Sequence, residues 1–366
     1  MTTRPRQSLL NPELQRPSTS TSVPRVPGVL WLDKNENLDP ELLAFNHGIL
    51  TALPRLALAT YPEAAACYRK LSDWLGVDPA HLMLTPGSDG AIRLVFEAFV
   101  ENGDAVVHTN PTFAMYPVYC QMFGARAVPV DYARTEAGPL LQSEQIIEAL
   151  RQHAPKLCCL PNPDSPTGTV LAPEEVSKIL AVCEELGTIL LIDEAYHPFY
   201  EWTAVPWTAA SRNLVVARTF AKAWGVAGLR MGYAVGHPQT MAVLHKMRPM
   251  YEVGTLAVDF MSVMLGHVPV MLESVARIKA GKACFVSAMR DLGFDVLPTH
   301  GNFVHVAFGA AGQGIHAGLS KKVLYRAAFD HPSLAGYSRF SVAPEAIMTQ
   351  VVDFIKQAMG KMGKRS

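Results

Sequence analysis

ILLIDEAY at residues 189–196 and LVVARTFAKAWGVAGLRMGY at residues 214–233 each begin with an apolar run that predicts a buried strand. The first run ends at Asp193, and the second is followed closely by Lys222. Neighbouring parallel strands place their carboxyl ends at the same edge of a sheet, so we expect Asp193 and Lys222 to face one pocket. These two residues alone leave open the alternative of a structural Asp–Lys ion pair at the sheet edge.

From about Tyr61 onward, β-rich runs alternate with helical patterns along the chain. Helical patterns at 91–100, 142–151 and 173–186 separate runs that are almost continuously apolar. This alternation is typical of a mostly parallel sheet covered on both faces, so we expect an α/β fold. The seven expected strands are 81–85, 105–109, 125–131, 156–160, 188–193, 213–218 and 231–235.

After about Asp259 the pattern changes to a long helical region at 259–292, two short β-like pieces at 302–307 and 338–342, and a closing helix at 344–362. It predicts a smaller C-terminal α+β domain that shares residues near 29–33. We therefore expect four parts. They are a flexible N-terminal arm (1–28), a segment joining the small domain (29–52), a large domain (53–258) and the small C-terminal domain (259–366).

The composition is that of a globular protein of enzyme size, because 49% of the 366 residues are apolar and 32 Lys+Arg balance 32 Asp+Glu. A pI near 7.2 argues against a dedicated nucleic-acid binder, which normally carries a basic excess. Charged residues make up only 17% of the chain, below the roughly 25% of an average soluble protein. We therefore expect part of the surface to be buried in subunit contacts.

The six cysteines show no C-x-x-C spacing and the twelve histidines no H-E-x-x-H spacing, so we expect reduced thiols in a cytoplasmic protein and no metal site. The most membrane-like window, 253–272, is interrupted by Asp259, His267 and Pro269. Since an acidic residue in mid-membrane costs about 2.5–3.5 kcal/mol, we interpret it as a buried interface helix. The Pro/Ser/Thr-rich N-terminal segment lacks the apolar core of a signal peptide.

A second group of residues predicts an anion site. Gly87, Ser88 and Asp89 follow an expected strand and precede a helix, whose N-terminus offers backbone N–H groups to an anion. Arg230 lies among three glycines, eight residues beyond Lys222, and a guanidinium there can grip a phosphate with two hydrogen bonds. Many loops between a strand and a helix have a similar sequence. Residues 87–89 therefore indicate an anion site only in combination with Arg230, Asp193 and Lys222.

Taken together, these features resemble the fold-type I pyridoxal-phosphate (PLP) enzymes, specifically the class I/II aminotransferases, and most of all the histidinol-phosphate aminotransferases. The similarity spans residues 32 to about 344. The motifs that carry it are LDKNEN (32–37), Tyr61-Pro62, GSDGAI (87–92), PTFAMY (111–116), NPDSPTG (162–168), DEAY (193–196), RTFAKAWGVAGLRMGY (218–233), RPMYEV (248–253), GNFV (301–304) and SRFSV (338–342). The resemblance implies a PLP-binding large domain with a seven-stranded sheet.

The resemblance also implies roles for single residues around the cofactor PLP. Lys222 matches the Schiff-base lysine, which later moves a proton between Cα and the cofactor. Asp193 matches the partner of the pyridine nitrogen, and Tyr196 the phenol that hydrogen-bonds the ring oxygen O3′. Phe113 matches the aromatic side chain stacked on the ring. The residues that match the phosphate cradle are Ser88, Asp89, Thr219 and Arg230.

Other matches concern the substrate and a partner subunit. Arg339 matches the arginine that clamps the substrate α-carboxylate, and Arg326 matches a basic position associated with the phosphate of histidinol phosphate. Asn37, in the LDKNEN motif, is expected at the substrate pocket. Tyr61 matches a tyrosine that reaches the neighbouring subunit's PLP phosphate, and Tyr251 matches a partner-subunit tyrosine. A homodimer with shared active sites is therefore implied.

Three positions depart from the family pattern. The family commonly has Asn directly before Pro-Thr-Gly, donating to O3′, whereas this chain has Ser165, so Tyr196 is expected to carry more of that contact. Gly90 stands in place of a Glu, and Leu38 in place of the usual Pro.

We therefore expect a PLP-dependent aminotransferase that moves an amino group to a 2-oxo acid, with histidinol phosphate and 2-oxoglutarate as the favoured pair. An aromatic, basic or unusual amino acid in a secondary pathway remains open as the donor. So do a PLP decarboxylase or cyclase on the same scaffold, because fold does not fix reaction type, and a non-enzymatic regulator with this fold.

Overall fold

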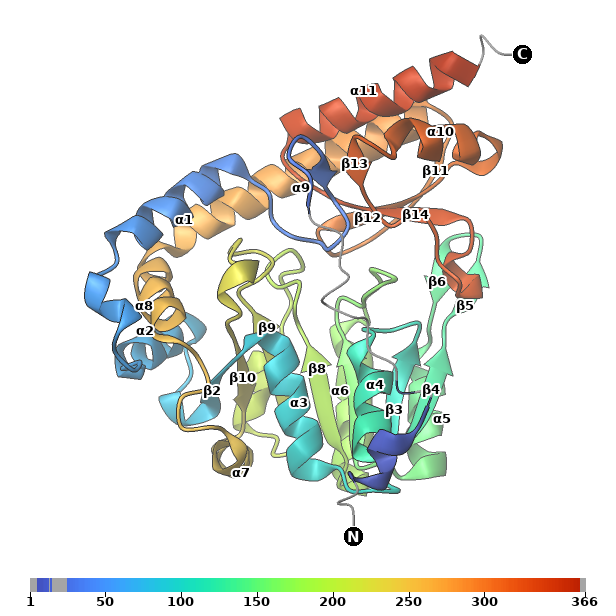
Figure 1. Cartoon of the computed structure of the whole chain (residues 1–366). Helices are drawn as coiled ribbons and strands as arrows, with labels where there is room; N and C mark the ends of the chain where they lie inside the picture. The colour runs from blue at the N-terminus through green and yellow to red at the C-terminus, as the bar shows by residue number, and fades with distance from the viewer. Residues whose placement is uncertain (1–4, 13, 15–24, 363–366) are drawn as a thin grey trace.

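The computed structural model describes residues 5–12, 14 and 25–362. Its larger part is built on a seven-stranded sheet, and a smaller part lies across the sheet's upper edge (Figure 1). The strands in spatial order are β2 (Leu82–Thr85), β10 (Gly232–Gly236), β9 (Leu214–Thr219), β8 (Ile189–Asp193), β7 (Leu157–Pro161), β3 (Ala105–Asn110) and β4 (Arg126–Asp131). Within this sheet β10 runs antiparallel to both neighbours, and the other pairings are parallel. The expected α/β fold is confirmed, each strand end lying within one residue of its predicted position.

Helices cover both faces of this sheet. Tyr116 belongs to an apolar cluster that joins α3, α4 and α7 to one face, and Ile146 to a cluster that joins α5 and α6 to the other. Cys158 and Cys159, adjacent on β7, belong to opposite clusters because successive strand side chains alternate. The helices are α2 (Ala65–Leu75), α3 (Gly87–Phe99), α4 (Met115–Phe123), α5 (Ser143–His153), α6 (Pro173–Leu186), α7 (Pro238–Met247) and α8 (Thr255–Met264).

Local sequence sets the ends of α6, which match the predicted range. Pro173 is at the start of the helix, where its missing N–H costs nothing. The Glu175 carboxylate accepts a hydrogen bond of 2.8 Å from the backbone N–H of Ala172. Gly187 then ends the helix with φ at +69°, a conformation that glycine adopts without steric cost.

The smaller part combines both ends of the described chain. β11 (Asp295–Leu297), β12 (Phe303–Ala307) and β14 (Tyr337–Ser341) form an antiparallel sheet. β1 (Leu30–Trp31) pairs with β13 (Val323–Leu324), and α1 (Pro40–Ala52) packs against α8 and α9. The N-terminal segment therefore lies with the C-terminal elements. The remaining helices are α9 (Val268–Asp291), α10 (Gly312–Leu319) and α11 (Glu345–Met362).

The differences from the sequence-based expectation include a break in a helix and an additional hairpin. The single helical region expected at 259–292 is two helices, α8 and α9, separated by the 3-10 turn η7 (Leu265–His267), with Pro269 in the first turn of α9. By length and hydropathy, 255–291 is the one candidate membrane span among the described residues. Val258 and Met271, one from each helix, lie in the same apolar cluster as one face of the sheet. A hairpin of β5 (Ala133–Thr135) and β6 (Gly138–Leu140) was not expected.

Part of the N-terminal arm is described. Residues Gln7–Leu10 form the 3-10 turn η1, and the Ser8 hydroxyl donates to the Met122 carbonyl of α4 at 2.9 Å. Most of the arm that the sequence predicted to be flexible lies outside the described residues.

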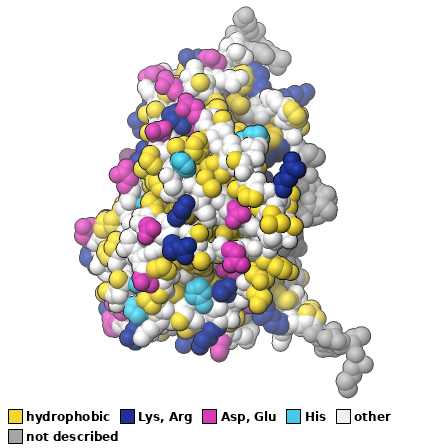
Figure 2. All heavy atoms as spheres, turned by 90° about the vertical axis from the view of Figure 1, so that its left-hand side faces the viewer, with side chains coloured by type: hydrophobic (Ala, Val, Ile, Leu, Met, Phe, Trp, Pro, Cys, Tyr) yellow, Lys and Arg dark blue, Asp and Glu magenta, His cyan; other side chains and the backbone are white. Residues whose placement is uncertain are grey.

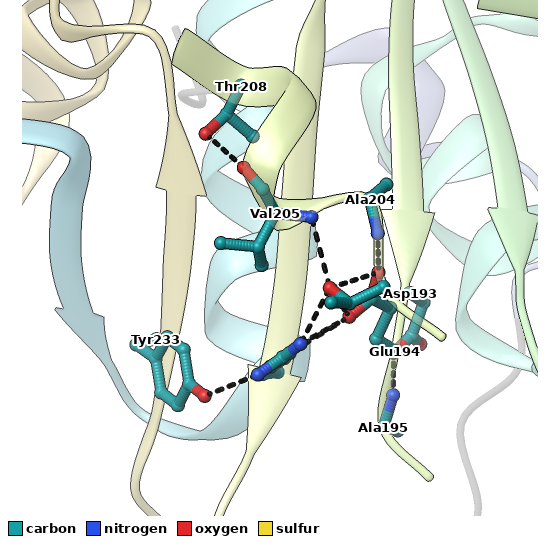
Figure 3. A network of polar contacts seen from close by, with 9 residues as sticks. Asp193, Glu194, Ala195, Ala204, Val205, Thr208 and Tyr233 are labelled. Carbon is teal, nitrogen blue, oxygen red and sulfur yellow. Dashed lines mark hydrogen bonds and ion pairs between the residues drawn. The ribbon is translucent and has the colours of Figure 1, made fainter. Parts of the chain in front are cut away.

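Behind the carboxyl edge of the sheet, Glu194 and Arg218 form an ion pair in which both side chains are at most 4% exposed. Arg218 donates from Nε and Nη2 to Glu194 Oε2, at 2.9 and 2.8 Å. The backbone N–H of Ala204 donates to Glu194 Oε1 at 2.7 Å, and Arg218 Nη1 donates to the Tyr233 hydroxyl at 3.3 Å (Figure 3). The pair thus joins the ends of β8, β9 and β10. The two charges neutralise each other, and neighbouring groups form hydrogen bonds with both side chains.

This pair gives a stability prediction. Arg218→Met should lower the free energy of unfolding by about 3–5 kcal/mol, because it leaves the Glu194 carboxylate buried without its cation. Adding Glu194→Gln should recover about 1–3 kcal/mol, because the unpaired charge is then gone. Urea unfolding of the three proteins at one protein concentration measures both steps. A double variant less stable than Arg218→Met would contradict the prediction.

Candidate active site

A cavity of about 530 Å³ opens at the carboxyl edge of the sheet, between the larger and smaller parts. Its size is within the usual range for small-molecule sites. The structure brings most of the predicted site residues together here. They are Ser88, Asp89, Phe113, Asp193, Tyr196, Thr219, Lys222, Arg230, Arg326 and Arg339.

Asp193 ends β8 inside this cavity and is 5% exposed. Its Oδ1 accepts a hydrogen bond from the backbone N–H of Ala195 at 3.0 Å, and its Oδ2 accepts one from the Tyr116 hydroxyl at 3.3 Å. Burial raises the pKa of Asp193 to about 7, against the opposing effect of these two donors. In its ionised form, the Asp193 carboxylate can accept a hydrogen bond from a protonated ring nitrogen and stabilise the positive charge of that ring.

Lys222 follows β9 and donates from Nζ to the Lys34 carbonyl at 2.6 Å. Burial, with the nearby positive charge of Arg339, lowers the pKa of Lys222 to about 8. An amine with this pKa is neutral in a substantial fraction near pH 7 and is therefore a usable nucleophile. The Asp–Lys ion pair left open by the sequence is absent from the described contacts, since Lys222 bonds a carbonyl instead.

Tyr196 lies between two polar side chains. The Asn35 amide donates from Nδ2 to the Tyr196 hydroxyl at 2.8 Å, and the hydroxyl reaches Ser165 Oγ at a long 3.4 Å. Burial raises the pKa of the Tyr196 phenol, which is therefore protonated and available as a donor.

The residues predicted to form an anion site lie at the N-terminus of α3, with one correction to the boundary of this helix. The helix begins at Gly87, so Ser88 and Asp89 lie in its first turn and not in a loop before it. Within the described residues, no side chain caps that turn. The Arg230 guanidinium lies against this turn, because a Cβ at position 87 would come 3.0 Å from Arg230 Nη2. The uncapped N–H groups and the guanidinium can bind a phosphate together.

The glycine at position 90 is explained by the same turn. A Cβ there would lie 2.7 Å from Cδ of Pro86, the residue that precedes α3. Pro86 therefore accounts for the absence of the Glu that the family has at this position.

Arg339 enters the cavity from β14 and is 8% exposed. Its Nη2 donates to the Asp33 carbonyl at 3.0 Å, its Nε has no partner, and no carboxylate of the described residues forms an ion pair with it. Arg326, paired with Arg339 across a β-bridge, lies over the Phe329 ring at 4.3 Å. Two guanidinium groups without carboxylate partners can receive anionic groups of a substrate.

Three predicted residues lie outside the cavity. The Asn37 amide donates to the Ala223 carbonyl and to Ser274 Oγ, both at 3.0 Å, so this side chain supports the segment after Lys222 instead of facing the cavity. Tyr61 and Tyr251 stack on each other with ring centroids 4.3 Å apart, on the outer surface.

Sequence reasoning missed two residues that the fold brings to this site. Asn35 occupies the place expected for Asn37, and the signal was its position in the same LDKNEN motif. Tyr116, whose hydroxyl donates to Asp193, is the last residue of PTFAMY, a motif in which only Phe113 was predicted to face the cofactor. Among the described residues, no group of three or more His, Cys, Asp or Glu side chains is placed to hold a metal ion.

The comparison with protein-family models decides the family. The model for "Aminotransferase class I and II" matches residues 27–355, which is most of the chain and includes every residue of the cavity. The chain belongs to this family. It is therefore a PLP-dependent aminotransferase, as expected from the motifs.

Individual relatives agree with this assignment. A histidinol-phosphate aminotransferase of Caldanaerobacter subterraneus subsp. tengcongensis is 30% identical over 341 residues, covering 92% of this chain and 95% of the relative. The solved histidinol-phosphate aminotransferase of Sinorhizobium meliloti, in complex with pyridoxal-5′-phosphate, has a TM-score of 0.78 at 24% identity and 91% coverage of both chains. The L-threonine-O-3-phosphate decarboxylase of Porphyromonas gingivalis has a TM-score of 0.74 at 22% identity, covering 91% of this chain and all of that one. These two structures establish the shared fold.

The cavity of the aminotransferase fits PLP in its charges and its donors. Lys222 would offer an amine to the aldehyde, Asp193 a carboxylate to the ring nitrogen, and the start of α3 with Arg230 would offer donors to the phosphate. Phe113 also lines the cavity, where its ring can pack on a planar ligand.

The low pKa of Lys222 gives a prediction for the apoenzyme. Since only the neutral amine attacks an aldehyde, the rate of covalent PLP attachment should rise about tenfold per pH unit and level off above about pH 8. A lysine with an unshifted pKa would still gain rate up to about pH 10. Stopped-flow absorbance over pH 6–10 measures this rate.

Lys222→Ala is the control for that experiment. After borohydride reduction, its mass should show no cofactor on the protein, whereas the wild type should carry one. A reduced adduct on Lys222→Ala, or a rate that rises steadily to pH 10, would contradict the assignment of this lysine.

Proposed function

We propose that this aminotransferase transfers the amino group of histidinol phosphate to 2-oxoglutarate. The observation that carries the proposal is the buried Arg339 guanidinium, which has no carboxylate partner among the described residues and lies beside the exposed Arg326. Histidinol phosphate brings a phosphate to this pair, and 2-oxoglutarate brings two carboxylates. The relatives at about 30% identity, which are histidinol-phosphate aminotransferases, support the same pair.

Each residue then has a physical task. Bound PLP supplies an aldehyde that condenses with amines and a ring that accepts electrons from the substrate Cα–H bond. Lys222 would hold the cofactor covalently and, once its amine is released, would take the Cα proton and deliver it to the cofactor carbon C4′. Asp193, oriented by Tyr116 and Ala195, keeps the proton on the ring nitrogen. Tyr196 donates to the ring oxygen O3′.

The phosphate and substrate ends of the cavity have separate donors. The first turn of α3 at Ser88 and Asp89, the Thr219 hydroxyl and Arg230 hold the cofactor phosphate in this proposal, and Phe113 packs on its ring. Arg339 holds the anionic group next to the reacting carbon. Arg326, which is exposed, would add a second guanidinium to the phosphate of histidinol phosphate.

A decarboxylase is the alternative with an observation in its favour. The P. gingivalis neighbour named as a decarboxylase has the same fold, and which Cα bond breaks depends on substrate orientation that the fold does not fix. An amino donor of aromatic, basic or unusual structure is the other alternative, favoured by the departures at Ser165, Gly90 and Leu38.

We also propose that the enzyme is a homodimer with shared active sites. Leu56, Leu58, Tyr61, Met250 and Tyr251 are 47–81% exposed, and Figure 2 shows hydrophobic side chains on the face of the molecule that carries α1, α2 and α8. Exposed apolar side chains gathered on one face are typical of a protein interface. Neither tyrosine lines the cavity of its own subunit, which fits a reach into the partner's cavity.

A cytoplasmic location belongs to the same proposal. The six cysteines are all free thiols in the structure, five of them buried. Unpaired cysteines are typical of proteins in a reducing compartment.

The half-reaction tests the substrate. Histidinol phosphate added without an oxo acid should remove the visible band of the bound cofactor, because the amino group moves onto it. Arg326→Gln should raise the histidinol phosphate concentration that removes half of the band by about 10- to 100-fold. This factor corresponds to the loss of one charge-assisted hydrogen bond. Arg339→Gln should do so for both histidinol phosphate and 2-oxoglutarate.

Arg290→Gln, an exposed arginine outside the cavity, is the matched control and should behave as the wild type. A band that is unchanged by histidinol phosphate but lost with an aromatic or basic amino acid would contradict the proposed amino donor. The assignment as an aminotransferase would stand. Release of CO₂ from an amino acid phosphate, without transfer, would favour the decarboxylase.

The dimer is tested by Leu58→Asp. Leu58 is 78% exposed in the single chain, and a carboxylate there should lose hydration when the second copy covers it. Light scattering should show a dimer for the wild type and a shift toward monomer for the variant. Leu140→Asp on β6, at the opposite side of the molecule in Figure 1, is the control and should stay dimeric. A monomeric wild type would contradict the proposal.

A further inference from the structure

Asn35 is held rigidly between the two parts of the molecule. It has φ at +55°, in the left-handed region that asparagine tolerates better than most residues. Its backbone N–H donates to Ser341 Oγ at 2.7 Å, and its carbonyl accepts from Asn302 Nδ2 at 3.0 Å. Asn35 is only 2% exposed. Its position is therefore set by the small domain, while its side chain reaches the Tyr196 hydroxyl.

The contacts of the Asn35 amide fix which way it points. The Ser341 hydroxyl donates to Asn35 Oδ1 at 3.2 Å, so the amide oxygen faces Ser341 and the NH₂ group faces Tyr196. An amide nitrogen can only donate. The Tyr196 oxygen is therefore an acceptor for Asn35 at 2.8 Å, and its own proton must point elsewhere.

Two directions remain for the Tyr196 proton. One is Ser165 Oγ at 3.4 Å, near the limit of a hydrogen bond, and the other is the cavity that both residues line. Ser165 stands where related aminotransferases have an asparagine whose amide donates to the cofactor oxygen O3′, and a hydroxymethyl group is shorter than that amide. On this side the cavity consequently has a hydroxyl of shorter reach in place of an amide donor.

We propose that Asn35 is a positioning residue that turns the Tyr196 proton into the cavity, toward O3′ of bound PLP, and so compensates for Ser165. The Asn35 amide also polarises the phenol, because a hydrogen bond accepted by an O–H group makes that group a stronger donor. This inference rests on the proposed PLP site and deepens it by naming the residue that controls the O3′ contact.

The charged groups around Tyr196 are Arg339 from β14, Asp193 at the end of β8 and Lys222 after β9. All three are unchanged by a substitution at Asn35. A change in the titration of the bound cofactor after such a substitution therefore reports on the hydrogen bond and not on the number of charges nearby.

The test is a pH titration of the visible absorbance of the holoenzyme. A donor to O3′ withdraws negative charge from the oxygen that holds the proton of the adjacent Lys222–cofactor nitrogen, so it lowers the pKa of that nitrogen. Asn35→Gly keeps the positive φ and removes the amide. It should raise the midpoint by about one pH unit, the size of one hydrogen bond to a charged group.

Rescue and control variants sharpen the test. Ser165→Asn, which restores the amide at the family position, should bring the midpoint of the Asn35→Gly protein back by at least half. Ser165→Ala should shift the midpoint less than Asn35→Gly, because the Ser165 contact is the longer one. If Asn35→Gly fails to fold, Asn35→Ala also removes the amide without adding a charge, and it should raise the midpoint as far.

The outcomes separate this inference from the proposed function. An unchanged midpoint in Asn35→Gly, or a Ser165→Asn change that rescues nothing, would overturn the role of Asn35 while the cofactor site stands. A wild-type protein that gains no visible band with PLP would instead overturn the proposed function. A larger shift for Ser165→Ala than for Asn35→Gly would assign the donor to Ser165.

Discussion

The ion pair between Glu194 and Arg218 is the constraint on which the active site depends. Side chains alternate along a strand, so Glu194 and Arg218 point away from the cavity where their neighbours Asp193 and Thr219 point into it. The contacts that fix the positions of Glu194 and Arg218 therefore also fix the positions of Asp193 and Thr219 in the cavity. A buried pair of this kind is stable only when its remaining donors and acceptors are satisfied, and Ala204, Thr203 and Tyr233 satisfy them.

The charges of the cavity follow from the elements that meet there. Lys222 and Arg230 come from the chain after β9, and Arg326 and Arg339 from the small domain, while Asp193 is the buried carboxyl that faces them. Burial, together with this excess of positive charge, lowers the pKa of Lys222, and the positive charge suits anionic ligands. The same small domain holds the segment 33–35 that closes the cavity from above, through Ser341 and Asn302. Cofactor chemistry and substrate recognition are thus built on opposite sides of one cavity.

Much of the fold could be predicted because the strands of a sheet covered on both faces are nearly continuous apolar runs. ILLID at 189–193 and LVVART at 214–219 leave little choice of structure. The helix-region break at Leu265–His267 and the β5–β6 hairpin were missed because both are short and are stabilised by packing with distant elements. The first turn of α3 was missed because glycine-rich sequence has weak helix propensity and the turn is held by Arg230 and by neighbouring strands.

The sequence alone determined the order of strands and helices and the chemical types at the strand ends, because apolar periodicity and local motifs are written in consecutive residues. Lys222, Asp193, Tyr196 and Arg230 belong to that class. Only the tertiary structure decided that Asn35, and not Asn37, faces the cavity and that Tyr116 donates to Asp193. It also decided that no carboxylate in the described part of the chain pairs with Arg339. Each of these depends on contacts between residues far apart in the chain, such as Asn35 with Ser341, and a linear pattern does not contain such contacts.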